Sequence, residues 1–83
     1  MKPRLKGYGS YNVIGKTVEE IRKSKGIKQG RFIAMLQSRG LDINPSSYSK
    51  LEGQIRNASD IEVYHIAAAL GVPMEKLFKA VSD

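Results

Sequence analysis

Three glycine residues, each followed by an aliphatic residue, divide most of this 83-residue chain into short segments. They occur at Gly26-Ile27, Gly40-Leu41 and Gly71-Val72. Glycine tolerates the left-handed backbone that commonly ends a helix, and the apolar residue after it folds back onto the last turn. The apolar residues before each pair recur at helical spacing, including Val63, Ile66, Ala67 and Leu70 at i, i+3, i+4 and i+7. The pattern predicts helices and offers no strand.

Helix starts complete the prediction of five short helices. Asn12 is expected to cap the first, and Asn44 followed by Pro45 is expected to begin the third. Ser59 and Glu62 form a Ser-x-x-Glu capping box before the fourth. After Pro73, a last helix carries Met74, Leu77, Phe78 and Val81 at helical spacing. We expect this stripe to close the core, or part of it to form a two-fold interface.

The chain is expected to be one domain, residues 12–83, preceded by a flexible basic arm, residues 1–11. The arm has no apolar segment typical of a secretory signal, and no apolar run has the roughly 20 residues that span a bilayer. A cytoplasmic protein without membrane attachment is the simplest interpretation. There is no cysteine and a single histidine, His65, so we expect neither a disulfide nor a metal site and no cofactor.

Positive charge is concentrated in the first two thirds of the chain. Residues 1–57 hold 12 basic and 4 acidic side chains, whereas residues 58–83 hold 2 basic and 4 acidic ones. One cationic face is typical of proteins that bind nucleic acid, although many small basic domains bind none. No paired carboxylates, activated nucleophile or glycine-rich phosphate loop is evident, so an enzyme is not expected.

The segment Asn44–Glu52 differs from the other predicted helices. Tyr48 and Leu51 are expected to face the core, with Ile55 just beyond, whereas the other positions carry serines and Lys50. Short hydroxyl side chains suit a helix pressed against another surface, and the DNA major groove admits one helix. Incidental serines on a marginal surface helix are the alternative interpretation.

The order and spacing of these motifs resemble the phage-repressor and Cro-like (XRE) family of helix-turn-helix proteins. The resemblance covers residues 14–78 and rests on the segments Ile14-Gly15, Ile21–Gln29, Leu51-Glu52 and Ile66–Val72. Leu36–Asn44 and Asp60–Val63 resemble a bacterial subgroup with a longer turn between the two motif helices. The resemblance implies an all-α, five-helix lambda-repressor-like bundle of bacterial or phage origin that binds double-stranded DNA and regulates transcription.

The resemblance also assigns roles to individual residues. Arg22 and Glu52 match a buried structural ion pair. The predicted DNA-binding residues fall into three groups: phosphate contacts near the second helix, the groove-facing side chains of the third helix, and a backbone clamp in the loop after it. In that order they are Lys28, Gln29, Arg39 and Asn44; Ser46, Ser47 and Lys50; and Arg56 and Asn57.

Two departures from the family pattern concern glycine. Gly30 lies in the first turn of the second helix, and Gly53 follows Glu52 directly, so that Gln54 takes the position usual for glycine. The path of the loop to Arg56 is therefore left open. Three partner hypotheses also remain open: operator DNA bound by a homodimer, a protein partner of an antitoxin or adaptor module docking on the Phe78 stripe, and minor-groove contact by the arm.

Overall fold

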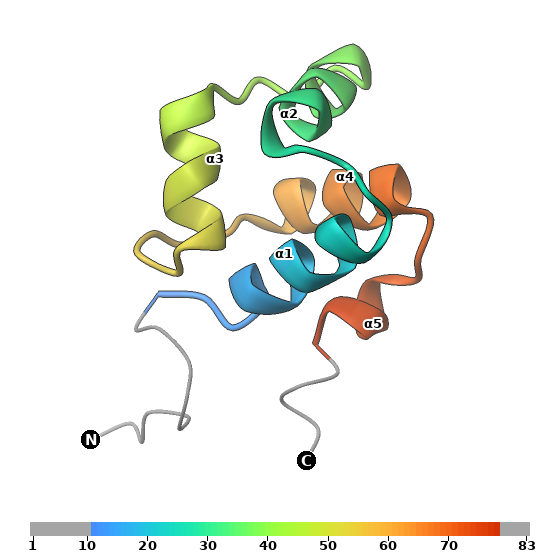
Figure 1. Ribbon diagram of the computed structural model, residues 1–83. Coiled ribbons are helices and arrows are strands. Elements are labelled where there is room, and N and C mark those ends of the chain that lie inside the picture. Colours follow the sequence, from blue (N-terminus) through green and yellow to red (C-terminus); the bar gives the residue numbers. More distant parts are fainter. Residues whose placement is uncertain (1–10, 79–83) are drawn as a thin grey trace, which may run out of the picture.

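The computed structural model describes residues 11–78 and contains five helices in that range (Figure 1). These are α1 (Gly15–Ser24), α2 (Gln29–Ser38), α3 (Pro45–Glu52), α4 (Asp60–Leu70) and α5 (Met74–Leu77). The part of the chain that the structure describes has no strand, which confirms the all-helical prediction. Residues 1–10, nearly all of the predicted arm, and Val81 of the last stripe lie outside the described residues. None of the described helices is long and apolar enough to cross a membrane.

The three predicted glycine stops end α1, α2 and α4. Gly26, Gly40 and Gly71 have φ angles of 71°, 94° and 73°. After each glycine, the amide of the aliphatic residue donates to a carbonyl in the last helical turn, as Ile27 N does to Arg22 O at 3.1 Å. This is the Schellman arrangement, which satisfies carbonyls that the helix itself leaves without partners.

The loop that leaves α3 uses glutamine where α1, α2 and α4 use glycine. Gln54 has a φ of 62°, whereas Gly53 keeps a right-handed backbone with a φ of −76°. The amide of Ile55 donates to Lys50 O at 3.0 Å, so the turn has the same hydrogen-bond pattern as the glycine stops. The side chain of Gln54 donates to Asn12 O at 3.1 Å, which ties this turn to the segment before α1.

Side chains cap the predicted starts of α3 and α4. Asn44 Oδ1 accepts from the Ser47 amide at 2.8 Å, with Pro45 in the first position of α3. Ser59 and Glu62 form both hydrogen bonds of the capping box before α4. The expected cap at Asn12 is wrong: the N-cap of α1 is Ile14, which has no side-chain cap, and Asn12 Oδ1 accepts from the Gly15 amide at 2.8 Å from two residues further back.

The core lies where α1, α2, α3 and α4 meet, and Leu77 of α5 closes it from one end. Phe32 of α2 and Tyr48 of α3 are both fully buried, with ring centroids 5.7 Å apart. The whole buried apolar set is Ile14, Val18, Phe32, Ile33, Leu36, Leu41, Ile43, Tyr48, Leu51, Ile66, Ala67, Leu70 and Leu77.

Three predicted core positions are wrong. Met74 and Phe78 are 47% and 40% exposed, and Ile55 is 61% exposed. Within the described residues, one turn of helix follows Pro73, and Leu77 is its buried side chain. Ile55 lies beyond the end of α3, where the left-handed turn at Gln54 changes the direction of the chain.

Candidate nucleic-acid interface

The described helix α3 has one buried face and one polar face. Tyr48 and Leu51 are fully buried, and Glu52 is buried beside them. Ser46, Ser49 and Lys50 are exposed, and Ser47 is half-buried. Ser46 and Lys50 are four residues apart, so their side chains are neighbours on one side of the helix. The polar face therefore presents two short hydroxyl groups and one cation, with no carboxylate among the exposed residues of α3.

A buried ion pair joins α1 to α3 beneath that polar face. Arg22 Nε donates to Glu52 Oε2 at 2.8 Å, and Nη2 donates to Oε1 at 3.1 Å. Arg22 Nη1 donates to Ile27 O at 2.7 Å, and the hydroxyl of Tyr48 donates to Glu52 Oε2. The two charged side chains are only 6% and 4% exposed. The predicted pair thus exists and fixes α3 through directed hydrogen bonds.

The same contacts perturb the titration of their neighbours. The hydrogen bond to Glu52 raises the pKa of Arg22 against the opposing effect of burial. Burial is the main cause that raises the pKa of the Tyr48 hydroxyl, and its hydrogen bond to Glu52 adds to it. The pKa of Tyr48 lies above its ordinary value of 10.0, so the hydroxyl is protonated at neutral pH and can donate to the carboxylate.

Gln29 connects the start of α2 to α3. Its Nε2 donates to Glu52 Oε1 at 3.3 Å, while its Oε1 accepts from the Ser49 hydroxyl at 3.0 Å. These two bonds fix the orientation of the amide, and the side chain remains half-buried at the surface. The structure thus brings Gln29, a predicted phosphate contact, beside the α3 helix that carries the predicted groove contacts.

The segment between α2 and α3, residues 39–44, is longer than a tight turn but is held by packing. Leu41 and Ile43 are buried in the core. The side chain of Gln37 donates to Ile43 O at 2.8 Å. Because both aliphatic side chains point into the core, this segment sets the position at which α3 begins.

Four further predicted DNA contacts, Lys28, Arg39, Asn44 and Asn57, are exposed. Lys28 precedes α2 directly, and Arg39 follows it. Arg39 Nε donates to His65 Nδ1 at 3.4 Å, a long hydrogen bond at the surface. His65 itself lies on α4 and is half-buried.

Arg56 has a structural role that the sequence prediction did not include. Its guanidinium forms a two-pronged ion pair with Glu62, with distances of 2.9 and 2.8 Å. Nε donates to Ser47 O at 2.8 Å, and Nη1 also donates to Asn57 O at 2.7 Å. Four of its five N–H donors are therefore bound to internal acceptors, which ties α3 to the start of α4. The pKa of Glu62 is lowered, chiefly by its hydrogen bonds to Arg56.

Sequence reasoning missed the long-range contacts of Asn12. Its Nδ2 donates to Leu51 O at 3.0 Å and to Arg56 O at 2.8 Å, while its Oδ1 accepts from the Gly15 amide. Nearby, Gly15 allows α1 and α3 to approach closely, since a Cβ there would lie 2.4 Å from Leu51 O. Helix spacing alone carries no signal for contacts between residues about forty positions apart.

The described residues contain no cluster of His, Cys, Asp or Glu side chains suited to hold a metal ion. No protein-family model matches the chain, and a search of curated proteins finds no matching relative.

Proposed function

We propose that this protein is a sequence-specific double-stranded DNA-binding regulator of the helix-turn-helix type, which acts by occupying an operator. In this proposal α2, residues 39–44 and α3 are the motif, and α3 enters the major groove. The observation that carries the proposal is the polar face of α3, where Ser46 and Lys50 are exposed while Tyr48, Leu51 and Glu52 are buried. The resemblance to the XRE family points the same way.

The charge of the motif supports a polyanionic partner. Residues 28–50 hold four basic side chains and one acidic side chain, Asp42. The carboxylate that follows them, Glu52, is buried against Arg22 and does not oppose phosphates at the surface. Lysine and arginine near a DNA phosphate release condensed counterions, and this release is a large part of the affinity.

Each exposed side chain has a role in the proposal. Lys50 binds O6 and N7 of a guanine, a contact that discriminates by about 1–3 kcal/mol against other bases. Ser46 and Ser47 contact base edges or phosphate through their hydroxyl groups. The residues proposed to contact phosphates are Lys28, Gln29, Arg39, Asn44 and Asn57.

Arg56 takes a different part in the proposal from the one the family resemblance implies. Its bonds to Glu62 and to Ser47 O hold the loop after α3 in place. We propose that Arg56 positions the exposed Asn57 and the last turn of α3, instead of clamping a phosphate itself. This assignment explains why a cation in that loop is paired with a carboxylate.

The test compares two lysine substitutions that change the net charge equally. Lys50→Ala removes the proposed base contact, whereas Lys76→Ala removes an exposed lysine of α5 far from the motif. Titration of a selected duplex by fluorescence anisotropy is expected to show at least a fivefold loss of affinity for Lys50→Ala and about twofold or less for Lys76→Ala. Equal losses for both variants would mean that Lys50 contributes only its charge.

Salt dependence gives a second reading of the same titration. Binding through several phosphate contacts makes the logarithm of the affinity fall linearly with the logarithm of salt concentration. Lys50→Ala is expected to keep most of this slope, because its proposed partner is a base. A homodimer bound to two half-sites about one DNA turn apart would appear as a palindromic site.

A second function is favoured by one observation, the exposure of Met74 and Phe78. In this alternative the same fold is a protein-interaction module, the antitoxin or adaptor half of a complex. A stoichiometric partner co-purifying with the chain, together with no retention on DNA at physiological salt, would favour this alternative over DNA binding.

A further inference from the structure

Ser49 lies on the same exposed side of α3 as Ser46 and Lys50. Residues three or four positions apart are neighbours on a helix, so Ser49 and Lys50 both lie beside Ser46. In the proposed DNA complex this side of α3 faces the major groove. The family resemblance gives roles to Ser46 and Lys50 and none to Ser49. The place of Ser49 on the helix nevertheless brings its hydroxyl to the surface that base edges would meet.

The Ser49 hydroxyl has a fixed partner in α2. It donates to Gln29 Oε1 at 3.0 Å, and Gln29 Nε2 in turn donates to Glu52 Oε1 at 3.3 Å. A serine hydroxyl has one proton and two acceptor lone pairs. Because its proton is directed to Gln29, the Ser49 hydroxyl presents only its lone pairs, as hydrogen-bond acceptors, to a further partner.

The buried ion pair decides which end of the Gln29 amide faces Ser49. Glu52 is paired with Arg22 at 2.8 Å, and an ionised carboxylate only accepts hydrogen bonds. An amide turned the other way would bring Gln29 Oε1 against Glu52 Oε1, two acceptors with no proton between them. Gln29 therefore directs its nitrogen to Glu52 and its oxygen to Ser49. A chain of hydrogen bonds from the buried Arg22 to the exposed Ser49 thus fixes where the hydroxyl proton points.

From this geometry, and resting on the proposed DNA-binding function, we infer that Ser49 is a specificity-determining residue that reads an exocyclic amine, N6 of adenine or N4 of cytosine. These amines are the hydrogen-bond donors of the major groove, whereas guanine and thymine present acceptors there. A hydroxyl that rotates freely serves donors and acceptors alike. The Ser49 hydroxyl accepts from an amine, but its lone pairs oppose O6 of guanine and O4 of thymine. Gln29 is the positioning residue that creates this difference.

Ser49 and Lys50 have complementary hydrogen-bonding chemistry in this assignment. The Lys50 ammonium only donates and is proposed to bind the acceptors of guanine, whereas the Ser49 hydroxyl only accepts. The two side chains leave α3 from consecutive positions. We therefore expect them to determine the preference at two different base positions of the site.

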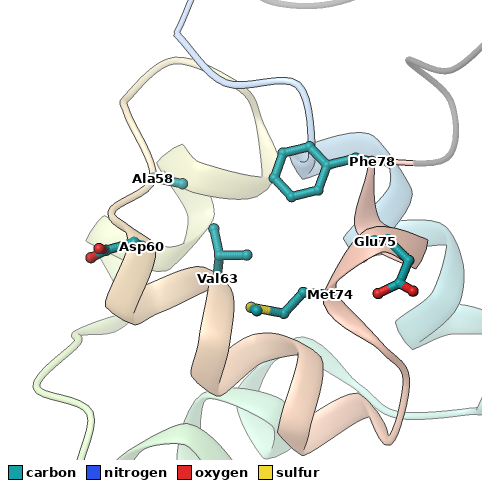
Figure 2. A pocket seen from close by; sticks show the side chains of 6 residues that line it. All are labelled: Ala58, Asp60, Val63, Met74, Glu75 and Phe78. Carbon is teal, nitrogen blue, oxygen red and sulfur yellow. The ribbon is translucent and has the colours of Figure 1, made fainter.

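The hollow between α4 and α5 is a poor surface for a duplex. It encloses about 610 Å³, and Figure 2 shows the side chains of Val63, Met74 and Phe78 around one common space. Its described lining also includes the exposed carboxylates of Asp60 and Glu75. Negative charge at this hollow repels the phosphates of DNA, so the exposed side of α3 is the better candidate for reading bases.

Substitution of single base pairs locates the pair that Ser49 reads. In the duplex selected by the parent protein, each pair is exchanged in turn, A·T for G·C and C·G for T·A, which swaps amine and carbonyl oxygen at the major-groove edge. Affinities are measured by fluorescence anisotropy. At one pair, the exchange is expected to weaken binding of the parent by at least about fivefold, the scale of one hydrogen bond, and binding of Ser49→Ala by about twofold or less.

Three further variants test the part of Gln29. Gln29→Ala frees the proton of Ser49 for donation to a carbonyl oxygen, so the response at the same pair is expected to fall to about twofold. Ser49→Thr keeps the hydroxyl, and Ser38→Ala removes an exposed hydroxyl at the end of α2. Both are expected to retain the response of the parent. The readout is a ratio of two affinities of one protein, so a lost phosphate contact or partial unfolding cancels.

Removal of the amine alone identifies the atom that is read. Replacing the adenine of that pair by purine, or the cytosine by pyrimidin-2-one, is expected to weaken binding of the parent about fivefold and to leave Ser49→Ala nearly unchanged. Undiminished binding of the parent to the analogue would overturn the inference. So would a Ser49→Ala or Gln29→Ala protein that keeps every base preference of the parent. In these outcomes the DNA-binding proposal stands, because a selected duplex exists. A parent protein that selects no duplex refutes the DNA-binding proposal and, with it, the role of Ser49.

Discussion

Replacement of Glu52 by glutamine is expected to destabilise the domain severely, because it leaves the buried Arg22 without its counter-ion. The guanidinium side chain is 6% exposed and cannot recover hydration without moving α1 away from α3. Glutamine can still accept hydrogen bonds through its one carbonyl oxygen, but its amide nitrogen cannot accept from Arg22 or Tyr48, and the side chain carries no charge. Breaking a buried pair in this way costs about 3–5 kcal/mol.

That cost is large for a chain of this length. At about 0.05–0.15 kcal/mol per residue, 83 residues correspond to a free energy of unfolding of about 4–12 kcal/mol. Each kcal/mol shifts the Tm of a domain of this size by about 4–8 °C, so Glu52→Gln is expected to lower the Tm by at least about 12 °C. Thermal unfolding followed by far-ultraviolet circular dichroism measures this shift directly.

Two further variants distinguish the cost of a buried unpaired charge from the cost of a lost hydrogen bond. Adding Arg22→Met to Glu52→Gln removes the unpaired cation, so the double variant is expected to be more stable than Glu52→Gln alone. Glu62→Gln breaks the ion pair with Arg56, whose side chains are 23% and 15% exposed, and is expected to cost less than Glu52→Gln. A loss below about 1 kcal/mol for Glu52→Gln would contradict this expectation, since solvent-exposed ion pairs contribute about that much or less.

Three other predictions follow from local contacts. Gly15→Ala places a Cβ within 2.8 Å of two backbone carbonyl oxygens of α3 and is expected to destabilise the domain by about 3 kcal/mol or more. Gly30→Ala places a Cβ with no atom of another element within 4 Å and is expected to stabilise the domain by up to about 1 kcal/mol. Urea unfolding measures both changes. Equal effects at the two glycines would contradict the close approach of α1 to α3. The pKa of Glu62 is lower in the folded protein than in the unfolded chain, so its pair with Arg56 contributes its full stability above the unfolded pKa and loses it as pH falls through the folded pKa. The difference in free energy of unfolding between the parent and Glu62→Gln is therefore expected to shrink below about pH 4. A series of unfolding curves at acid pH would detect this change. A pH-independent difference would count against the ion pair. Asn44→Ala removes the side-chain cap of α3 and is expected to lower the free energy of unfolding by about 1 kcal/mol. Ser46→Ala, on the exposed face of α3, is expected to change the free energy of unfolding by less than about 0.5 kcal/mol. Thermal unfolding measures both. Similar losses for both would mean that the cap contributes nothing specific.

Sequence signals that act within a few residues predicted much of this fold. The glycine stops at 26, 40 and 71 each adopt the left-handed backbone expected of them, and Asn44 and Ser59 cap their helices. The period of the apolar residues marked the buried faces of α1, α2 and α4, because a continuous core requires one apolar side on each helix.

Apolar spacing was less informative where an element is short. Met74, Leu77 and Phe78 share helical spacing, yet Leu77 alone of the three is buried, because one turn of helix places one side chain into the core. Spacing tells which residues lie on a common face but does not tell how far the neighbouring elements extend to cover it. The exposure of Met74 and Phe78 follows from how α5 lies against α4, which spacing does not predict.

The candidate site shows the same division between local and distant contacts. The separation of Tyr48 and Leu51 from Ser46 and Lys50 was evident from the sequence, and the structure places them on opposite faces of α3. The pairing of Arg56 with Glu62 was not predicted. Arg56 was predicted to contact the DNA backbone, and Glu62 was predicted to form the capping box. Sequence spacing does not show that the loop between them brings the two side chains together.

The proposal that α3 reads DNA sequence can be tested by selecting bound duplexes from a random library with the parent protein and with Lys50→Ala. The parent is expected to enrich a defined motif containing guanine, and Lys50→Ala is expected to enrich the same motif with the preference lost at one base pair. An unenriched library, or an identical motif from both proteins, would contradict the assignment of α3 and Lys50 as the elements that read the sequence.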